Sequence, residues 1–306
     1  MSTLQPALST IDPGTIYDDE LREKLRAYYD ARDHGRFWKF NFDRAWVKFE
    51  RGVRQESDLA DLVSRWVDLK GANVLVIGSY MGSEAIAYAL RGAHVVGIDL
   101  DENAMALSRE LAARWGVEID IRSMDAVNTS FPDASFDYIS CAQVLEHVPP
   151  DQQPKLLAEI WRLLKPGGAF WLDTPNQLAI KDHHDTGLPF IHWLPRSIKV
   201  PLARAIGRDE PNDEPAFGNK PVYLHYYVGY FQLKRILARL GPYEIVSRYR
   251  GYADPSHYAE SRKKQGRGDG LGFPVKVAFM RVALSVWNMN WMSGIRMVIR
   301  KLPQGG

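Results

Sequence analysis

The chain has 306 residues, of which 45% are hydrophobic, so it can bury a substantial core and still carry extensions beyond a minimal domain. Its net charge of only +2 at pH 7 argues against a protein devoted to nucleic acid. The single cysteine, Cys141, excludes an intramolecular disulfide framework and fits a reducing compartment. The first 30 residues carry charges throughout and show no apolar signal-peptide core, so we expect a cytoplasmic protein.

Residues 1–70 are expected to form an N-terminal helical cap. Helical patterns run over residues 18–31, over the aromatic-rich segment 37–48 and over residues 58–69 before Gly71. Aromatic side chains at helical spacing are more often core than ligand contacts, so they identify no substrate.

The segment from Val74 to Gly82, VLVIGSYMG, predicts a strand, a glycine turn and the start of a helix. In an open α/β sheet this turn receives a nucleotide-like ligand at the carboxyl edge, although such turns also serve packing alone. A second apolar run, residues 94–98, ends in Asp99. A carboxylate at that position is suited to accepting hydrogen bonds from a ribose diol, or it caps the helix that starts near Glu102.

Three further segments follow in a fixed order. Ser123–Ala126 comes after a short predicted strand, FPDASFDYISCAQVLEHVPP spans residues 131–150, and LLKPGG at residues 163–168 leads into another strand. With these motifs the chain resembles the class I S-adenosylmethionine (SAM)-dependent methyltransferases over about residues 69–251. The resemblance is to the small-molecule branch that includes ubiquinone O-methyltransferases. It implies a Rossmann-like, seven-stranded, mostly parallel sheet with helices on both faces, in a SAM-binding domain over residues 71–255.

The resemblance transfers a cofactor site residue by residue. The residues expected to contact SAM are Gly78, Ser79, Tyr80, Gly82, Asp99, Leu100, Met124, Asp125, Ala126 and Gln143. The chain departs from the family pattern twice, because Tyr80 replaces the middle glycine of the loop and Val76 replaces an acidic residue. Asp125 also has a simpler interpretation as a turn residue.

Candidate catalytic side chains follow the fourth and fifth predicted strands. In a first mechanism, His147, His183 or His184 is a general base, oriented by Asp182 or Asp185. In a second, which draws on the resemblance, Glu146, His147 and His184 bind Mg²⁺ or another divalent metal that acidifies the acceptor. Gln143 stands where that metal pattern has a glutamate, which removes one anionic ligand. The histidines also have a purely structural interpretation.

Two segments lie outside this pattern. Residues 177–222 form an insertion whose length and aromatic content predict an acceptor lid or a dimer contact. Residues 256–306 carry nine Lys and Arg against two acidic residues, a net charge of +7 that leaves −5 on the rest of the chain. Within them, residues 275–301 predict a basic amphipathic helix that lies in a membrane interface, or packs on the domain or on a second subunit in a homodimer.

The leading functional hypothesis is O-methylation of a small-molecule or lipid-linked hydroxyl acceptor. Methylation of nitrogen or carbon is the first alternative, and a SAM-binding module without catalysis is the second. A nucleic-acid acceptor is disfavoured because the basic residues gather in the tail instead of around the site.

Overall fold

The computed structural model describes residues 13–31, 41–182, 184–207, 225–247, 259, 260, 263, 272–287 and 294–303. Its helices are α2 (Pro13–Ile16), α3 (Asp19–Asp30), α4 (Phe42–Val63), α5 (Ser83–Ala89), α6 (Glu102–Arg114), α7 (Gln153–Leu163), α8 (Arg196–Ala205), α9 (Tyr230–Leu240) and α11 (Gly272–Trp287), with short 3₁₀ turns η2 (Leu145–His147) and η3 (Ile191–Trp193). Its strands are β1 (Asn73–Ile77), β2 (His94–Asp99), β3 (Asp120–Ser123), β4 (Phe136–Ala142), β5 (Leu164–Pro175), β6 (Tyr243–Ser247) and β7 (Gly294–Lys301).

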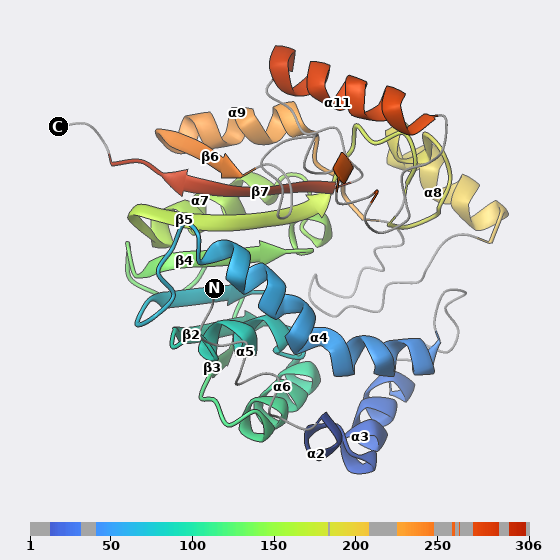
Figure 1. Ribbon diagram of the computed structural model, residues 1–306. Helices are drawn as coiled ribbons and strands as arrows, with labels where there is room; N and C mark the ends of the chain where they lie inside the picture. Colours follow the sequence, from blue (N-terminus) through green and yellow to red (C-terminus); the bar gives the residue numbers. More distant parts are fainter. Residues whose placement is uncertain are drawn as a thin grey trace.

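The seven strands form one sheet in the order β3-β2-β1-β4-β5-β7-β6, which confirms the predicted seven-stranded, mostly parallel architecture (Figure 1). β7 runs antiparallel to both of its neighbours, β5 and β6. The other strands run in one direction, so the carboxyl ends of β1, β2, β3, β4 and β5 lie at one edge of the sheet. Side chains that follow these strands are therefore brought together there.

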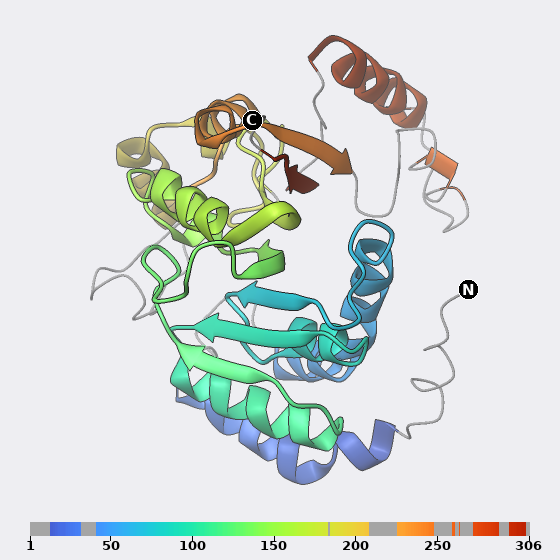
Figure 2. The same ribbon diagram turned by 90° about the vertical axis from the view of Figure 1, so that its left-hand side faces the viewer.

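Both faces of the sheet are covered, as apolar runs in parallel strands require. On one face, Leu75 and Ile139 belong to a core cluster with α7 and α9. On the other face, Val74 and Tyr138 pack with α4 and α5. A third cluster joins α2, α3, α4 and α6 at the β3 side of the molecule (Figure 2).

The N-terminal helices are present, but α4 is one continuous helix over residues 42–63 and replaces two separately predicted segments. Gly52 lies inside this helix, where a glycine suggests an interruption from sequence alone. A Cβ atom at Gly52 would lie 2.4 Å from Ser83 Oγ, so the glycine allows α4 to approach the start of α5. Tertiary packing thus outweighs the low helical propensity of this residue.

The prediction of an amphipathic helix over residues 275–301 is wrong in its second half. α11 ends at Trp287, and Gly294–Lys301 forms β7, inserted between β5 and β6. Ile295, Met297 and Ile299 are buried in the core of the sheet. The basic tail, residues 256–306, therefore contributes a strand to the sheet, although the predicted domain ended at residue 255. None of the described helices, α11 included, is long and apolar enough to cross a membrane.

Candidate functional site

The glycine loop between β1 and α5 needs both of its outer glycines. Gly78 and Gly82 adopt φ angles of +68° and +81°, which L side chains rarely adopt. A Cβ atom at Gly78 would lie 2.4 Å from a methyl carbon of Val144, and one at Gly82 would lie 2.1 Å from Ser108 Oγ. The loop is therefore close-packed against the β4–η2 connection and against α6.

Tyr80, which replaces the middle glycine, holds a left-handed φ of +46°. Its ring packs edge-on against Tyr28 of α3 at 6.0 Å, and its hydroxyl donates to the Tyr29 hydroxyl at 3.4 Å. The Tyr28 hydroxyl in turn donates to Asp101 Oδ2 at 2.7 Å. The substitution thus ties the N-terminal cap to the glycine loop, a contact that a glycine would not make.

Asp99 ends β2 directly beside this loop. Its carboxylate accepts backbone N–H groups from Tyr80 at 2.7 Å, Leu100 at 2.8 Å and Asp101 at 2.9 Å. Burial raises the pKa of Asp99, although these three donors act in the opposite direction. The helix cap considered for this residue is made by Asp101, which accepts from Asn103 N and Ala104 N at the start of α6. Asp99 therefore orders the loop.

The segment after β3 lies at the same edge. Met124 N donates to the Asp99 carbonyl oxygen at 3.1 Å, which joins the β3 and β2 ends. Met124 and Ala126 are half-buried and pack against the main core cluster. Asp125 Oδ1 accepts from Val127 N at 2.9 Å, so its turn role is present in the structure.

Gln143 follows β4 and adopts a left-handed φ of +58°. Its backbone N–H donates to the Asp173 carbonyl at 2.7 Å, and its Nε2 lies 3.2 Å from Asp173 Oδ1. Asp173 also binds Arg296 of β7 through Nε at 2.9 Å. β7 therefore supports the end of β5 beside the site as well as the core.

A cluster of two carboxylates and three histidines follows β4 and β5. Glu146 in η2 is completely buried, and its Oε2 accepts from Thr174 Oγ1 at 3.0 Å. Burial raises the pKa of Glu146. Its Oε1 lies 3.6 Å from His184 Nε2 and accepts no hydrogen bond from the described part of the chain.

The remaining members of this cluster surround Asp185, which is 5% exposed. Its Oδ1 lies 3.1 Å from His184 Nδ1 and contacts His225 Nδ1, and its Oδ2 accepts from His225 N at 3.0 Å. The His225 ring stands edge-on to the rings of His147 and His184, each at 4.4 Å between centroids. We call Glu146, His147, His184, Asp185 and His225 the histidine cluster.

The pKa values of His184 and His225, which both contact Asp185, are shifted in opposite directions. Burial opposes the charged form of His184, but the hydrogen bond to Asp185 and the charges of Asp185 and Glu146 raise its pKa above 6.5. Burial dominates at His225 and lowers its pKa below 6.5 despite the contact with Asp185. Hydrogen bonds from both histidines hold the pKa of Asp185 well below its ordinary value, against the effect of burial. Relative to the free side chains, these shifts favour the ionised form of Asp185, the protonated form of His184 and the neutral form of His225.

Asp182 has a different role from the one considered in the sequence. It accepts from Thr186 N at 2.9 Å, Asp185 N at 2.9 Å and the Tyr227 hydroxyl at 2.5 Å. These bonds build the turn that presents His184 and Asp185, so Asp182 positions the cluster without orienting an imidazole. His183, another predicted base, lies outside the described residues.

His225 and Lys199 were missed from the sequence. His225 is 40 positions from Asp185 and reaches it because Tyr226 N donates to the Glu146 carbonyl at 2.8 Å. Lys199 is buried on α8, and its Nζ donates to the His225 carbonyl at 3.0 Å. The only local signal for His225 is its place in LHYYVGYF, shortly before α9 begins at Tyr230.

The donors of the histidine cluster also fit a divalent metal. One ligand atom each from His184, Asp185 and His225 lies within 4.8 Å of the others, and the unbonded Oε1 of Glu146 lies beside them. Of the expected set Glu146, His147 and His184, only His184 belongs to this group of three, and Asp185 and His225 are its other two members. Imidazoles with carboxylates suit Zn²⁺, Mn²⁺ or Fe²⁺ better than Mg²⁺, which prefers oxygen ligands.

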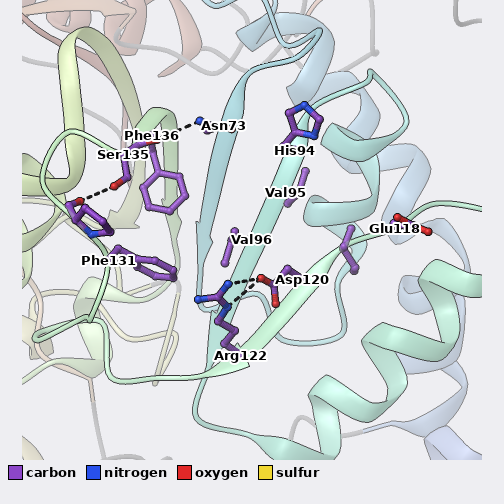
Figure 3. Close-up of a pocket in the computed structure, with 12 residues that line it drawn as sticks. Asn73, His94, Val95, Val96, Glu118, Asp120, Arg122, Phe131, Ser135 and Phe136 are labelled. Carbon is purple, nitrogen blue, oxygen red and sulfur yellow. Dashed lines mark hydrogen bonds and ion pairs between the residues drawn. The ribbon is translucent and has the colours of Figure 1, made fainter.

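Figure 3 shows a hollow on the opposite edge of the sheet. It is lined by the first residues of four strands, Asn73, His94, Asp120 and Phe136 among them, and by the Arg122–Asp120 ion pair at 2.6 Å. Ligands of open α/β sheets bind at the carboxyl ends of the strands, so this hollow is not the cofactor site.

Part of the chain is similar to known methyltransferases. Residues 75–172 match the model of a family described as a methyltransferase domain. Ubiquinone biosynthesis O-methyltransferases of Pseudomonas putida (strain W619) and Pseudomonas aeruginosa (strain UCBPP-PA14) are 33% and 34% identical to the chain over 152 and 151 residues. These matches cover 47% of this chain and 64% of each relative, which is less than two thirds of the relatives' length.

Two solved structures share the fold. A SAM-dependent methyltransferase from Mesorhizobium loti aligns with a TM-score of 0.52 at 15% identity, over 81% of this chain and 99% of that one. A putative sarcosine dimethylglycine methyltransferase from Galdieria sulphuraria aligns with a TM-score of 0.52 at 16% identity, over 92% and 98%. The resemblance read from the sequence is thereby confirmed: residues 75–172 match a methyltransferase-domain family, and the sheet has the fold of a solved SAM-dependent methyltransferase.

Proposed function

We propose that this protein transfers the methyl group of SAM to a hydroxyl oxygen of a small-molecule or lipid-linked acceptor. The observation that carries the proposal is the contact between the buried carboxylate of Asp185 and Nδ1 of His225 at the carboxyl edge of the sheet, where burial lowers the pKa of His225. The relatives are named as O-methyltransferases of ubiquinone biosynthesis, which supports an oxygen acceptor.

In this proposal the edge formed by β1, β2 and β3 holds SAM. Beyond its three backbone donors, Asp99 has one acceptor site left, on Oδ2, for a ribose hydroxyl. Leu100 and Met124 supply apolar surface for the adenine. The loop residues Gly78 and Ser79 offer backbone groups to the amino-acid end, which compensates for Val76 in place of a carboxylate. Because the sulfonium already activates the methyl group, the protein needs to align the reactants, exclude water and remove one proton.

His225 is the proposed general base. Its Nδ1–H donates to Asp185, which fixes the tautomer and leaves the basic lone pair on Nε2. The acceptor hydroxyl transfers its proton to Nε2 as its oxygen attacks the methyl carbon and the S–CH₃ bond breaks. His184 is less suited to this role because its two ring nitrogens lie beside Asp185 and Glu146, which favour its protonated form.

A second version of the same function uses a metal. His184, Asp185 and His225, with Glu146, would hold a divalent transition metal, and that metal would acidify the acceptor hydroxyl. The unbonded, fully buried Oε1 of Glu146 favours this version. In it, His225 is a ligand and no longer removes the proton.

The experiment begins with calorimetric titration of the protein with S-adenosylhomocysteine, followed by methyl-transfer assays on hydroxyl acceptors that include quinone precursors, with and without EDTA. His225→Gln should reduce kcat by about a hundredfold or more and leave S-adenosylhomocysteine affinity unchanged. His94→Gln is the matched control, because His94 is exposed at the opposite edge of the sheet.

The outcomes separate the alternatives. Loss of wild-type activity in EDTA selects the metal version over the free base. Methylation of amines or carbon acids with no hydroxyl product selects the first alternative acceptor class. Absence of S-adenosylhomocysteine binding contradicts the proposal and leaves a module without this cofactor.

A further inference from the structure

A chain of buried hydroxyl groups holds the carboxylate of Glu84, which lies in the first turn of α5, two residues after Gly82. Its Oε1 accepts from Ser140 Oγ at 2.5 Å and from the Tyr88 hydroxyl at 2.9 Å. Because Tyr88 uses its proton for this bond, the Tyr138 hydroxyl donates to the Tyr88 oxygen at 3.1 Å. Ser140, Tyr88 and Tyr138 are fully buried, so the core fixes the position of the Glu84 carboxylate.

The register of the sheet places this carboxylate beside Val76. Ser140 of β4 is the direct partner of Val76 on β1. Neighbouring side chains at one register position of a sheet point to the same face, so the Ser140 hydroxyl and the Val76 side chain lie next to each other. Val76 also packs in the same core cluster as Tyr88. Glu84 therefore brings a carboxylate from α5 to the row of the sheet at which the family pattern has an acidic residue and this chain has Val76.

The two described donors to Oε1 orient the carboxylate without neutralising it, because both are uncharged hydroxyl groups. Burial and the charge of Glu84 raise the pKa values of Tyr88 and Tyr138, so both phenols keep the protons that form these bonds. Glu84 itself is half-buried at this position. A carboxylate in such a place is screened less by solvent than one on the surface, and it attracts a nearby cation more strongly.

This charge lies near the loop that receives the amino-acid end of the cofactor in the proposed function. Val76 is two residues before Gly78, and a parallel strand rises about 3.3 Å per residue, so the row of Val76 lies about 7 Å from the start of the loop. Helix α4 packs closely on the residue before Glu84, because a Cβ atom at Gly52 would lie 2.4 Å from Ser83 Oγ. The first turn of α5, and with it Glu84, is thus fixed relative to the loop.

We propose that Glu84 is the anion that orients the α-ammonium group of SAM at the glycine loop, in place of the carboxylate that β1 lacks at Val76. The amino-acid end of SAM carries an ammonium group beside the sulfonium, and an anion under the loop attracts both. The identity of the cofactor rests on the proposed function. The competing interpretation is structural, in which Glu84 only joins α5 to β4 through Ser140.

The test compares two ligands by calorimetric titration of the full-length protein. S-adenosylhomocysteine carries the ammonium group, whereas 5′-methylthioadenosine has the same nucleoside and a sulfur atom but no amino-acid end. Glu84→Gln keeps the shape of the side chain and removes its charge. It should lower the affinity for S-adenosylhomocysteine by about tenfold or more and change that for 5′-methylthioadenosine by less than about twofold. Glu102→Gln is the matched control, because Glu102 is an exposed residue in the first turn of α6, and it should bind both ligands like the wild type.

A second variant separates the charge from the bond to Ser140. Val76→Asp/Glu84→Gln returns a carboxylate to β1 and leaves α5 without one at position 84. It should recover most of the affinity for S-adenosylhomocysteine that Glu84→Gln loses, because the anion is again beside the loop. A structural role of Glu84 would not be recovered in this way. Urea unfolding of each variant shows whether it is folded.

Each result supports or overturns the assignment. Equal losses of affinity for both ligands in Glu84→Gln overturn it in favour of the structural interpretation, and so does an unchanged affinity for S-adenosylhomocysteine. A folded double variant that binds no better than Glu84→Gln also overturns it. If the double variant does not fold, the comparison of the two ligands decides alone. A wild type that binds neither ligand contradicts the proposed function instead, so the two failures are distinguishable.

Discussion

The position of β7 in the sheet gives the sharpest prediction about stability. Ile299 is fully buried, faces the main core cluster and pairs with Phe170 of β5 and Ile245 of β6. Ile299→Ala should therefore lower the free energy of unfolding by about 2–5 kcal/mol. Since domains are stable by only about 5–15 kcal/mol, this is a large share of the total. Urea unfolding followed by circular dichroism measures the change.

The matched control is Val286→Ala on α11, where the side chain is 64% exposed. That change should cost about 0.5 kcal/mol or less. Truncation after residue 293 removes four buried side chains, Ile295, Met297, Val298 and Ile299, worth roughly 1.5–3 kcal/mol each and roughly 6–12 kcal/mol together. The truncated chain should not fold. A truncated protein that unfolds cooperatively near the wild-type midpoint would refute the reasoning. It would show that the C-terminal residues are peripheral to the core.

Three further predictions concern the site. Asp99→Ala should weaken S-adenosylhomocysteine binding by about tenfold or more in calorimetry, because three loop N–H groups lose their acceptor together with the ribose. Gly82→Ala should destabilise the protein in urea unfolding by about 1–3 kcal/mol more than Gly116→Ala, which shares a positive φ but has open space around its Cβ. The ionised form of Asp185 contributes stability that is present above its ordinary pKa of 3.8 and is lost as the pH falls toward its depressed folded value. Asp185→Asn should accordingly make the free energy of unfolding fall less steeply as the pH is lowered. An unchanged pH dependence in acid would contradict the stabilising contacts of Asp185 with His184 and His225.

The sheet and its glycine loop could be predicted because their signals are local. The sequence from Val74 to Gly82 contains the strand, the turn and the helix start within a few residues, and positive φ angles at both outer glycines confirm the turn. Resemblance to a family then supplied the seven-stranded, mostly parallel architecture, which no single segment contains. The later strand and the insertion depend on contacts distant in sequence, and there the prediction was weaker.

β7 was mistaken for a helix because Arg296 and Arg300, four residues apart, continue a polar stripe at helical spacing that starts at Arg281. Two residues at this spacing share one face of a helix, but they also share one face of a strand, where the period is two. The pattern of apolar residues alone does not distinguish a helix from a strand here. Met297 and Ile299 face one core cluster while Val298 faces the other, so both sides of the strand are buried and the period of two is obscured.

Only part of the site could be predicted, because one of its members is distant in sequence from the others. The segment Lys181–Asp185 is the densest cluster of titratable residues in the chain. Of its described candidates, His184 and Asp185 join the histidine cluster, whereas Asp182 does not. The third partner, His225, is recruited through main-chain bonds to η2 and through Lys199. The spacing of neighbouring residues does not identify such a residue. Its contact with the carboxylate depends on how the whole chain folds.

The division of roles between the two histidines leads to a final prediction about Glu146. His184 and His225 share Asp185, but only His184 also faces the buried carboxylate of Glu146, at 3.6 Å. Glu146→Gln should therefore lower the pKa of His184 and leave that of His225 below 6.5, as measured by NMR titration of the imidazoles. Because burial raises the pKa of Glu146, its charge opposes folding at neutral pH, and the variant should be at least as stable as the wild type. A variant that is less stable, with an unshifted His184, would show that Glu146 is held by its bond to Thr174 alone and does not polarise the cluster.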